Sequence, residues 1–224
     1  MFIITGASSG IGEFIFKKFA SQNLIVEGTY LHTKPDNLTG YSKVNVQNYE
    51  EVKEWLDDLN LDEKLVLINV AGINSNEMFH KSNLQNWSDV IDVNLKSVYN
   101  TCRYLIPIMR QNKFGRIINF SSVVAQKGVP GTSAYAASKA ALWGLTKNLA
   151  VENAKYNITA NNLNLGYFNT GMIKDIPDNM LTTIKENIPA GRLGEPNEVL
   201  NAIEFLINTP YVNGTSIDIN GGYY

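Results

Sequence analysis

Short apolar runs alternate with longer amphipathic segments along the whole chain. The runs have the length of buried strands, whereas the longer segments repeat apolar residues at helical spacing. We predict strands at residues 2–5, 24–30, 42–46, 64–72, 116–122, 158–164 and 215–220. We predict helices at residues 11–22, 49–60, 84–111, 134–154, 178–187 and 196–208.

The alternation of strands and helices indicates a parallel sheet covered by helices on both faces. Right-handed crossovers turn this order into a doubly wound Rossmann sheet. No linker, internal repeat or low-complexity segment interrupts the pattern. We therefore expect a single α/β domain over residues 1–224, with a mainly parallel seven-stranded sheet.

Composition limits the classes of function. The 224 residues are 44% hydrophobic and 18% charged, which is ordinary for one globular core. The net charge of -2 provides no basic field for a phosphate backbone, so we expect no nucleic-acid partner. No apolar run approaches the roughly 20 residues that span a bilayer, so we expect no membrane association.

Cysteine and histidine usage argues against a metal site. Cys102 is the only cysteine, which excludes an internal disulfide and a thiolate zinc site. His32 and His80 are far apart and have no ligand spacing. We expect no bound metal and a reducing, cytoplasmic location. We assign no role to the frequent asparagines.

A glycine-rich turn, TGASSGIG (5–12), follows the first predicted strand and opens the first helix. Such a turn lets a pyrophosphate approach the backbone at a helix N-terminus. Taken alone, it is also compatible with a plain tight turn. The residues expected at this contact are Gly6, Ser8, Ser9, Gly10, Ile11 and Gly12.

The stretch SAYAASKAAL (133–142) carries a phenol and an ammonium four residues apart on one helix face. We expect Lys139 to lower the pKa of Tyr135, which makes the phenol a better acid–base catalyst. For an isolated pair, a packed tyrosine and a solvated lysine are the simpler interpretation.

The spacing T-G-x-x-x-G-x-G resembles the short-chain dehydrogenase/reductase family, and other motifs follow in the order of that family. Ser122 precedes Tyr135 by 13 residues, as the family pattern requires. The resemblance covers essentially the whole chain and is greatest to the 3-oxoacyl-acyl-carrier-protein reductase branch. The matching motifs are NVAG (69–72), VNL (93–95), FSS (120–122), Tyr135 with Lys139, IPAGRLGEPNEV (188–199) and NGG (220–222).

The resemblance implies reduction of a carbonyl to a secondary alcohol by hydride transfer. It implies that Tyr135 passes the proton and that Ser122 holds the carbonyl oxygen. It also implies that Asn94 supports a water near Lys139, and that Lys139 bonds the nicotinamide ribose. Further cofactor contacts implied by the family are Asn69, Ala71, Gly72, Gly166 and Thr170.

The cofactor is expected to be NADP(H), with NAD(H) as the alternative. NAD-dependent relatives carry an acidic residue at the end of the second strand, where this chain has Tyr30. His32 and Lys34 follow and can pair with a 2′-phosphate, although a solvated loop is the simpler interpretation. Asn45 and Val46 are expected near the adenine.

The family's mobile substrate lid corresponds to residues 167–191, and Leu165 stands where the family has proline, so that loop loses a fixed backbone angle. The branch suggests a 3-oxoacyl thioester substrate. Its carrier protein would meet Arg110, Lys113 and Arg116 near the active-site mouth, although ordinary surface charge explains them equally well.

Three alternatives remain open. The substrate is a small ketone or sugar, the enzyme is an NAD-linked dehydrogenase of another small alcohol, or the chain is a dinucleotide sensor without turnover. The family also implies a homotetramer, with interfaces from residues 141–152 and 205–224, unless both segments merely pack the core.

Overall fold

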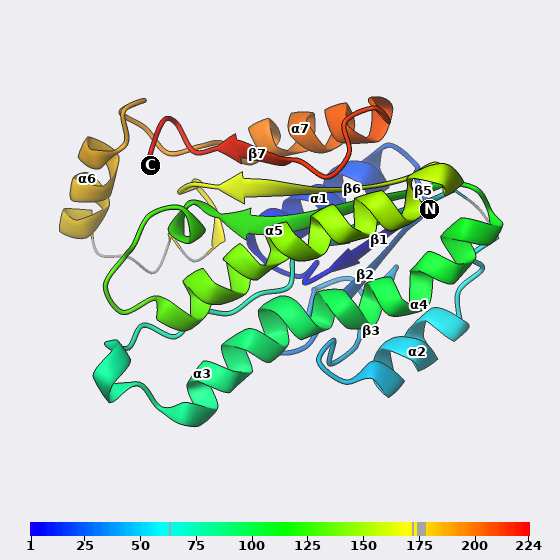
Figure 1. The fold of residues 1–224 in the computed structure, drawn as a ribbon, viewed down its shortest axis with the longest axis horizontal. Coiled ribbons are helices and arrows are strands. Elements are labelled where there is room, and N and C mark those ends of the chain that lie inside the picture. Colours follow the sequence, from blue (N-terminus) through cyan, green and yellow to red (C-terminus); the bar gives the residue numbers. More distant parts are fainter. Residues whose placement is uncertain (63, 172, 174–177) are drawn as a thin grey trace.

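The computed structural model describes residues 1–62, 64–171, 173 and 178–224. Seven strands form one sheet in the order β3-β2-β1-β4-β5-β6-β7, and each neighbouring pair is parallel (Figure 1). The strands are β1 (Phe2–Thr5), β2 (Val26–Tyr30), β3 (Tyr41–Lys43), β4 (Leu65–Asn69), β5 (Gly115–Ser122), β6 (Ile158–Leu165) and β7 (Ser216–Ile219).

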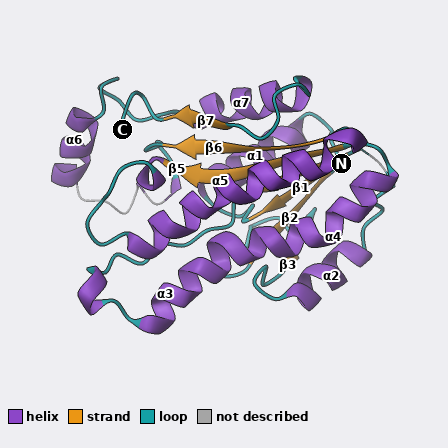
Figure 2. Cartoon of the chain, in the orientation of Figure 1, coloured by secondary structure: helices purple, strands orange, loops and turns teal. Residues whose placement is uncertain are grey.

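Helices follow the strands on both sides of the sheet (Figure 2). The longer ones are α1 (Gly10–Ser21), α2 (Tyr49–Asp57), α3 (Leu84–Ile91), α4 (Ser97–Gln111), α5 (Ser133–Asn153), α6 (Asp178–Asn187) and α7 (Pro196–Asn208). The short helical turns are η1 (Phe79–Lys81), η2 (Asp92–Lys96), η3 (Val123–Ala125) and η4 (Ala154–Tyr156).

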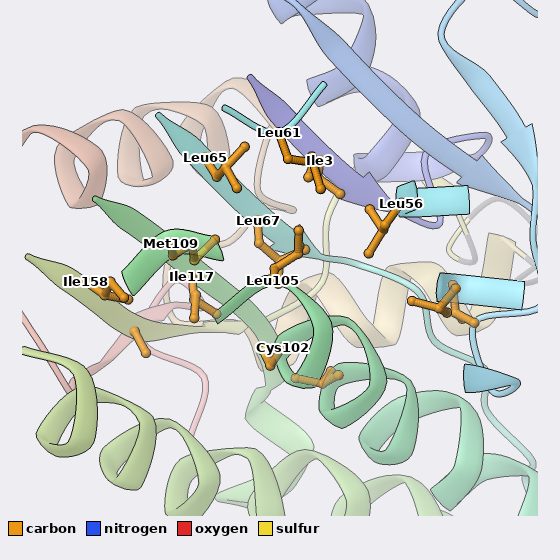
Figure 3. Close-up of a cluster of buried hydrophobic side chains, with 14 of the residues drawn as sticks. Ile3, Leu56, Leu61, Leu65, Leu67, Cys102, Leu105, Met109, Ile117 and Ile158 are labelled. Atoms are coloured by element: carbon orange, nitrogen blue, oxygen red, sulfur yellow. The ribbon is translucent and has the colours of Figure 1, made fainter. Parts of the chain in front are cut away.

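Two hydrophobic layers hold this arrangement, because successive strand residues point to opposite faces. In β1, Ile3 packs with α2, α4 and α5, whereas Ile4 packs with α1 and α7. Leu67 and Ile68 divide in the same way in β4. Figure 3 shows the first layer, in which Leu105 of α4 lies against the sheet. Burial on both faces is what a parallel sheet requires.

The predicted seven-stranded doubly wound sheet is therefore confirmed, with differences at element ends. The second strand begins at Val26 rather than residue 24, and Leu24 and Ile25 are exposed. The predicted helix 84–111 contains the π-helical turn η2. No helix of the described residues is long and apolar enough to cross a membrane.

Strand order reverses between β1 and β4, and crevices at such points bind ligands in open α/β sheets. Helix α6 lies beyond the carboxyl ends of β5, β6 and β7 (Figure 1). The carboxyl edge of the sheet is therefore the edge at which a site is expected.

Candidate active site

The loops after β1 and β4 are fixed side by side at the reversal point. Thr5 and Asn69 are register partners at the strand ends. The Thr5 hydroxyl accepts hydrogen bonds from the backbone N–H groups of Val70 and Ala71, at 3.2 and 3.3 Å. This places Ala71 beside the glycine turn, with Gly72 directly after it.

The turn between β1 and α1 has glycine where a side chain does not fit. Gly6 has φ of 65°, and a Cβ there would lie 2.8 Å from the Ala71 Cα. A Cβ on Gly12 would lie 2.2 Å from the Gly6 carbonyl oxygen. Glycine at these positions allows the tight strand-to-helix turn that brings backbone N–H groups to a helix N-terminus, as a pyrophosphate site requires. This turn contains Gly6, Ser8, Ser9, Gly10, Ile11 and Gly12.

Ser122, Tyr135 and Lys139 meet at the carboxyl end of β5. Ser122 is the last residue of this strand, and Tyr135 and Lys139 lie in the first turns of α5. The side chains of Ser122 and Tyr135 are hydrogen-bonded to each other. Lys139 Nζ lies 5.6 Å from the centroid of the Tyr135 ring and donates to the Phe120 carbonyl at 2.7 Å.

Asn94 joins this group from the π-helical turn η2, which interrupts the α3–α4 helix. Its Oδ1 accepts from the Ile73 N–H at 2.8 Å, and its Nδ2 donates to the Ile73 carbonyl at 2.9 Å and to Ser138 Oγ at 3.0 Å. A Cβ on Gly72 would lie 3.2 Å from Asn94 Oδ1 and 3.4 Å from Lys139 Nζ. The two side chains therefore flank the same space, and π-helical turns are frequent at such sites.

Burial controls the titration of the two central groups. Burial raises the pKa of Tyr135 above its usual value, and the Ser122 hydrogen bond opposes this only in part. Burial lowers the pKa of the Lys139 ammonium to about 8. The expectation that Lys139 lowers the pKa of Tyr135 is wrong for this structure, because desolvation of the phenol outweighs other influences.

A hydrogen-bond network behind Ser122 was not foreseen from the sequence. Ser121 Oγ donates to the Lys139 carbonyl at 2.9 Å and accepts from Trp143 Nε1 at 3.0 Å. Trp143 Nε1 also donates to Asn164 Oδ1 of β6 at 3.0 Å. This network ties β5, α5 and β6 together behind the catalytic candidates. The sequence feature that could have indicated this network is the position of Trp143, one helical turn after Lys139.

A second buried series of hydrogen-bonded side chains links α4, β4, β5, α5 and β6. It gives some of the frequent asparagines a structural role that we did not predict from the sequence. Thr101 donates to Asn69, Asn69 to Asn119, and Asn119 to Thr146, at 2.8 to 2.9 Å. Thr146 then donates to Asn162 of β6 at 2.8 Å. The amide oxygen and nitrogen of Asn69 are thus both engaged inside the protein. Its side chain holds strands together rather than facing the predicted cofactor site.

The end of β2 has the open, non-acidic character that the sequence predicted. Tyr30 is half-buried at the strand end, and His32 and Lys34 are exposed on the loop that follows. Asn45 Oδ1 accepts from the Gln47 N–H at 3.2 Å, so its amide oxygen is engaged locally. Val46 is buried.

The loop after β6 lies against the glycine turn. Gly166 donates its N–H to the Ile219 carbonyl at 2.9 Å, and a Cβ there would lie 2.8 Å from the Asn220 Cα. Thr170 precedes Gly171, and the backbone of Gly171 approaches Gly10 so closely that a Cβ on Gly10 would lie 3.1 Å from the Gly171 Cα. Of the predicted lid, residues 172 and 174–177 lie outside the described residues.

The expected carrier-protein patch does not lie at this mouth. Arg116 is the second residue of β5 and Ser122 is its last residue, so the two lie near opposite ends of this strand. Arg116 is 4% exposed and donates to the Ile207 and Asn157 carbonyls. Arg110 bonds Asn153 Oδ1. Within one chain these cations therefore do not form a docking surface beside the catalytic candidates.

Comparison with known proteins agrees with the geometry. The family model described as enoyl-(acyl carrier protein) reductase matches residues 6–224. A 3-oxoacyl-(acyl-carrier-protein) reductase of Haemophilus influenzae is 34% identical over 238 residues, covering 99% of this chain and 97% of the relative. An acetoacetyl-CoA reductase of Shinella zoogloeoides is 36% identical over 234 residues, with the same coverage.

The solved structures agree as well. The crystal structure of 3-oxoacyl-(acyl-carrier protein) reductase from Brucella melitensis superposes with a TM-score of 0.91 at 29% identity, covering 100% of this chain and 90% of that chain. Sequence and fold therefore agree with these relatives along the full length. The chain belongs to the short-chain dehydrogenase/reductase family and is an oxidoreductase that interconverts alcohol and carbonyl groups with NAD(P).

Proposed function

We propose that this protein is an NADP(H)-dependent reductase of a 3-oxoacyl thioester. The observation that carries the proposal is the convergence of Ser122, Tyr135, Lys139 and Asn94 beside the glycine turn. A dinucleotide-binding protein without turnover has no physical need for all four groups. The 3-oxoacyl substrate is suggested by relatives whose names include 3-oxoacyl-(acyl-carrier-protein) reductase and acetoacetyl-CoA reductase.

Tyr135 is the proton donor in this proposal. Because burial raises its pKa, the phenol is protonated at neutral pH, as reduction of a carbonyl requires. A bound dihydronicotinamide supplies the hydride to the carbonyl carbon. The phenol O–H bond breaks as the substrate alcohol O–H bond forms. Ser122 donates a hydrogen bond to the substrate oxygen and holds it beside the phenol.

Lys139 and Asn94 assist the proton transfer by Tyr135. The Lys139 ammonium favours the phenolate that remains on Tyr135 after the transfer. With a pKa of about 8, the ammonium is mostly protonated at neutral pH and can itself release a proton. Asn94 fixes the Ile73 backbone beside that ammonium through two hydrogen bonds.

The preference for NADP(H) rests on the loop after β2. Tyr30 offers no carboxylate to repel a 2′-phosphate, while the exposed Lys34 and His32 are close by in sequence. Dissociation constants for NADPH and NADH measure this directly. We expect tighter NADPH binding, and expect Lys34→Gln to weaken NADPH binding about tenfold while leaving NADH binding unchanged. Tighter NADH binding by the unmodified protein would overturn the preference.

The reaction is tested by following NADPH absorbance with three classes of carbonyl. Acetoacetyl-CoA and acetoacetyl-N-acetylcysteamine represent thioesters, ethyl acetoacetate represents plain ketoesters, and a keto sugar represents the alternative substrates. Turnover highest on the thioesters supports the proposal. Turnover confined to the sugar would assign another substrate to the same site, and NADPH binding without any turnover would favour a sensor.

The active unit is proposed to be a cytoplasmic homotetramer of single-domain chains, with residues 167–191 as the substrate lid. Three helices carry exposed apolar side chains that an interface would cover. Tyr99 of α4 is 55% exposed, Val151 of α5 is 83% exposed and Phe205 of α7 is 48% exposed. The buried position of Cys102 is compatible with a reducing compartment.

A further inference from the structure

A lysine that takes no part in the proton transfer lies just beyond the carboxyl end of β5. Lys127 follows the turn η3, which begins directly after Ser122. Its N–H donates to the Val123 carbonyl at 2.9 Å. The preceding residue, Gln126, donates through Nε2 to Asp218 Oδ1 of β7 at 2.9 Å. The backbone that carries Lys127 is therefore fixed to the catalytic strand and to the neighbouring sheet edge.

Two tyrosine rings connect the Lys127 ammonium to the catalytic centre. Lys127 Nζ lies 3.9 Å from the centroid of the Tyr223 ring. The Tyr223 ring meets Tyr167 edge to face, with centroids 5.8 Å apart. Tyr167 stands two residues after Leu165, the β6 residue in register with Ser122, so it lies at the same end of the sheet as Ser122. Tyr223 thus packs against both Lys127 and Tyr167, and the two rings form an aromatic wall beside the lysine.

The charge on Lys127 is not neutralised by this arrangement. A ring face stabilises an ammonium at close range but carries no net charge. Among the described residues, Lys127 makes no ion pair, whereas Lys17, Lys53 and Arg192 each do. Asp218 is the nearby acid, and its Oδ1 accepts from the amides of Gln126 and Asn164.

We propose that Lys127 is a specificity-determining residue that binds an anionic group on the carbonyl substrate, beside the aromatic wall formed by Tyr167 and Tyr223. The inference rests on the proposed reductase function and narrows its substrate to carbonyl compounds that carry a negative charge. The shared chemistry is an oxyanion, either a substrate carboxylate or the phosphates of a thioester carrier. The aromatic wall keeps the long lysine side chain in place, which reduces the entropy lost when the anion binds.

Three probes share the acetoacetyl group and differ in charge, so they show whether phosphate, carboxylate or neither is recognised. Acetoacetyl-CoA carries phosphates, acetoacetate carries a carboxylate, and acetoacetyl-N-acetylcysteamine is a neutral thioester. For the charged probe that the site accepts, Lys127→Gln should lower kcat/KM about tenfold, mainly by raising KM. The neutral probe should change less than twofold. A loss for acetoacetyl-CoA alone identifies phosphate as the recognised anion, and a loss for acetoacetate identifies carboxylate.

Two further variants control for packing. Lys127→Arg keeps the charge and should retain the preference for the anionic probe. Lys64→Gln removes a lysine that lies 5.4 Å from the Phe114 ring, beside β4 where that strand begins, and should change no probe. An equal effect of Lys127→Gln on charged and neutral probes, or no effect on either, would overturn the inference.

A binding measurement separates this inference from the proposed reaction. The dissociation constant of 3-hydroxybutyryl-CoA is measured calorimetrically at low and high salt. Salt should weaken its binding to the unmodified protein more than to Lys127→Gln. If the protein reduces none of the probes but shows this difference in binding, the reductase proposal fails while anion binding by Lys127 is supported. If both turnover and anion-dependent binding are absent, the inference fails as well.

Discussion

At the scale of single residues, burial decides the charge of the catalytic candidates. Lys139 is 4% exposed, and its ammonium donates to a backbone carbonyl rather than to a carboxylate. Without a neutralising partner, desolvation lowers its pKa to about 8. The phenol of Tyr135 is desolvated too, and its pKa moves in the opposite direction, because its charged form is the anion.

The Lys139 pKa predicts how stability depends on pH. Between about pH 8 and 10 the unfolded chain holds a proton on Lys139 that the folded chain has lost. The free energy of unfolding should therefore rise with pH in that window, by at most about 1.4 kcal/mol per unit. Below pH 8 both states are protonated, and the contribution is constant.

Urea unfolding of the unmodified protein and Lys139→Met at several pH values isolates this contribution. From pH 8 to 10, the free energy of unfolding of the unmodified protein should rise relative to that of Lys139→Met. Tyr135 is present in both proteins, so its own titration cancels in this difference. A pH-independent difference would show that the pKa of Lys139 is not lowered.

The sequence predicted which candidate residues lie together better than their physical state. The motif spacings were enough to bring Ser122, Tyr135 and Lys139 to one strand end. The direction of the Tyr135 pKa shift was wrong, because it depends on how deeply the phenol lies, which spacing does not reveal. The Ser121–Trp143–Asn164 network was missed for a similar reason, since its partners come from three elements.

At the scale of elements, the glycine turn is limited by backbone contacts. Gly12→Ala would bring a Cβ within 2.2 Å of the Gly6 carbonyl, so the turn must shift. We expect a loss of about 1–3 kcal/mol in the free energy of unfolding and at least tenfold weaker NADPH binding. The matched control is Gly128→Ala, since a Cβ on Gly128 meets nothing within 4 Å. Calorimetric titration with NADPH should show normal binding for Gly128→Ala, and normal binding for Gly12→Ala would contradict the account.

The buried asparagine chain gives a second prediction at this scale. Asn119→Ala would leave Asn69 Nδ2 and Thr146 Oγ1 without their partner in the sheet interior. Because Thr146 keeps its hydrogen bond to Asn162, one orphaned amide and one lost hydrogen bond should cost about 2–4 kcal/mol in the free energy of unfolding. The exposed Asn148→Ala should change it by no more than about 0.5 kcal/mol. Equal effects in chemical denaturation would show that the chain across the sheet contributes little.

Element order was predictable because the alternation of apolar runs and amphipathic helices is strong. Element ends were less predictable, as with the π-helical turn η2. Its extra residue places Asn94 towards Ile73 and Ser138. The apolar spacing of residues 84–111 does not indicate where the helix takes a π-helical turn. The position of that turn depends on contacts with α5 and with the loop after β4, which the spacing does not show.

At the scale of the whole molecule, the proposed assembly explains exposed apolar side chains that the single chain leaves uncovered. Val151 is 83% exposed on α5, so Val151→Asp should cost an isolated chain no more than about 0.5 kcal/mol. In a tetramer the same change places carboxylates in an interface and should separate the subunits. Light scattering should give four times the chain mass for the unmodified protein and a smaller mass for the variant. A monomeric unmodified protein would remove the proposal.

The most direct test of the central claim is turnover by Tyr135→Phe. The substitution removes the phenol hydroxyl and keeps the ring, so NADPH should bind with little change. Turnover of the carbonyl substrate that the unmodified protein reduces should fall by about a factor of 10²–10⁴, while Tyr49→Phe should remain active. Near-normal turnover by Tyr135→Phe, with NADPH bound, would contradict the assignment of Tyr135 as the proton donor.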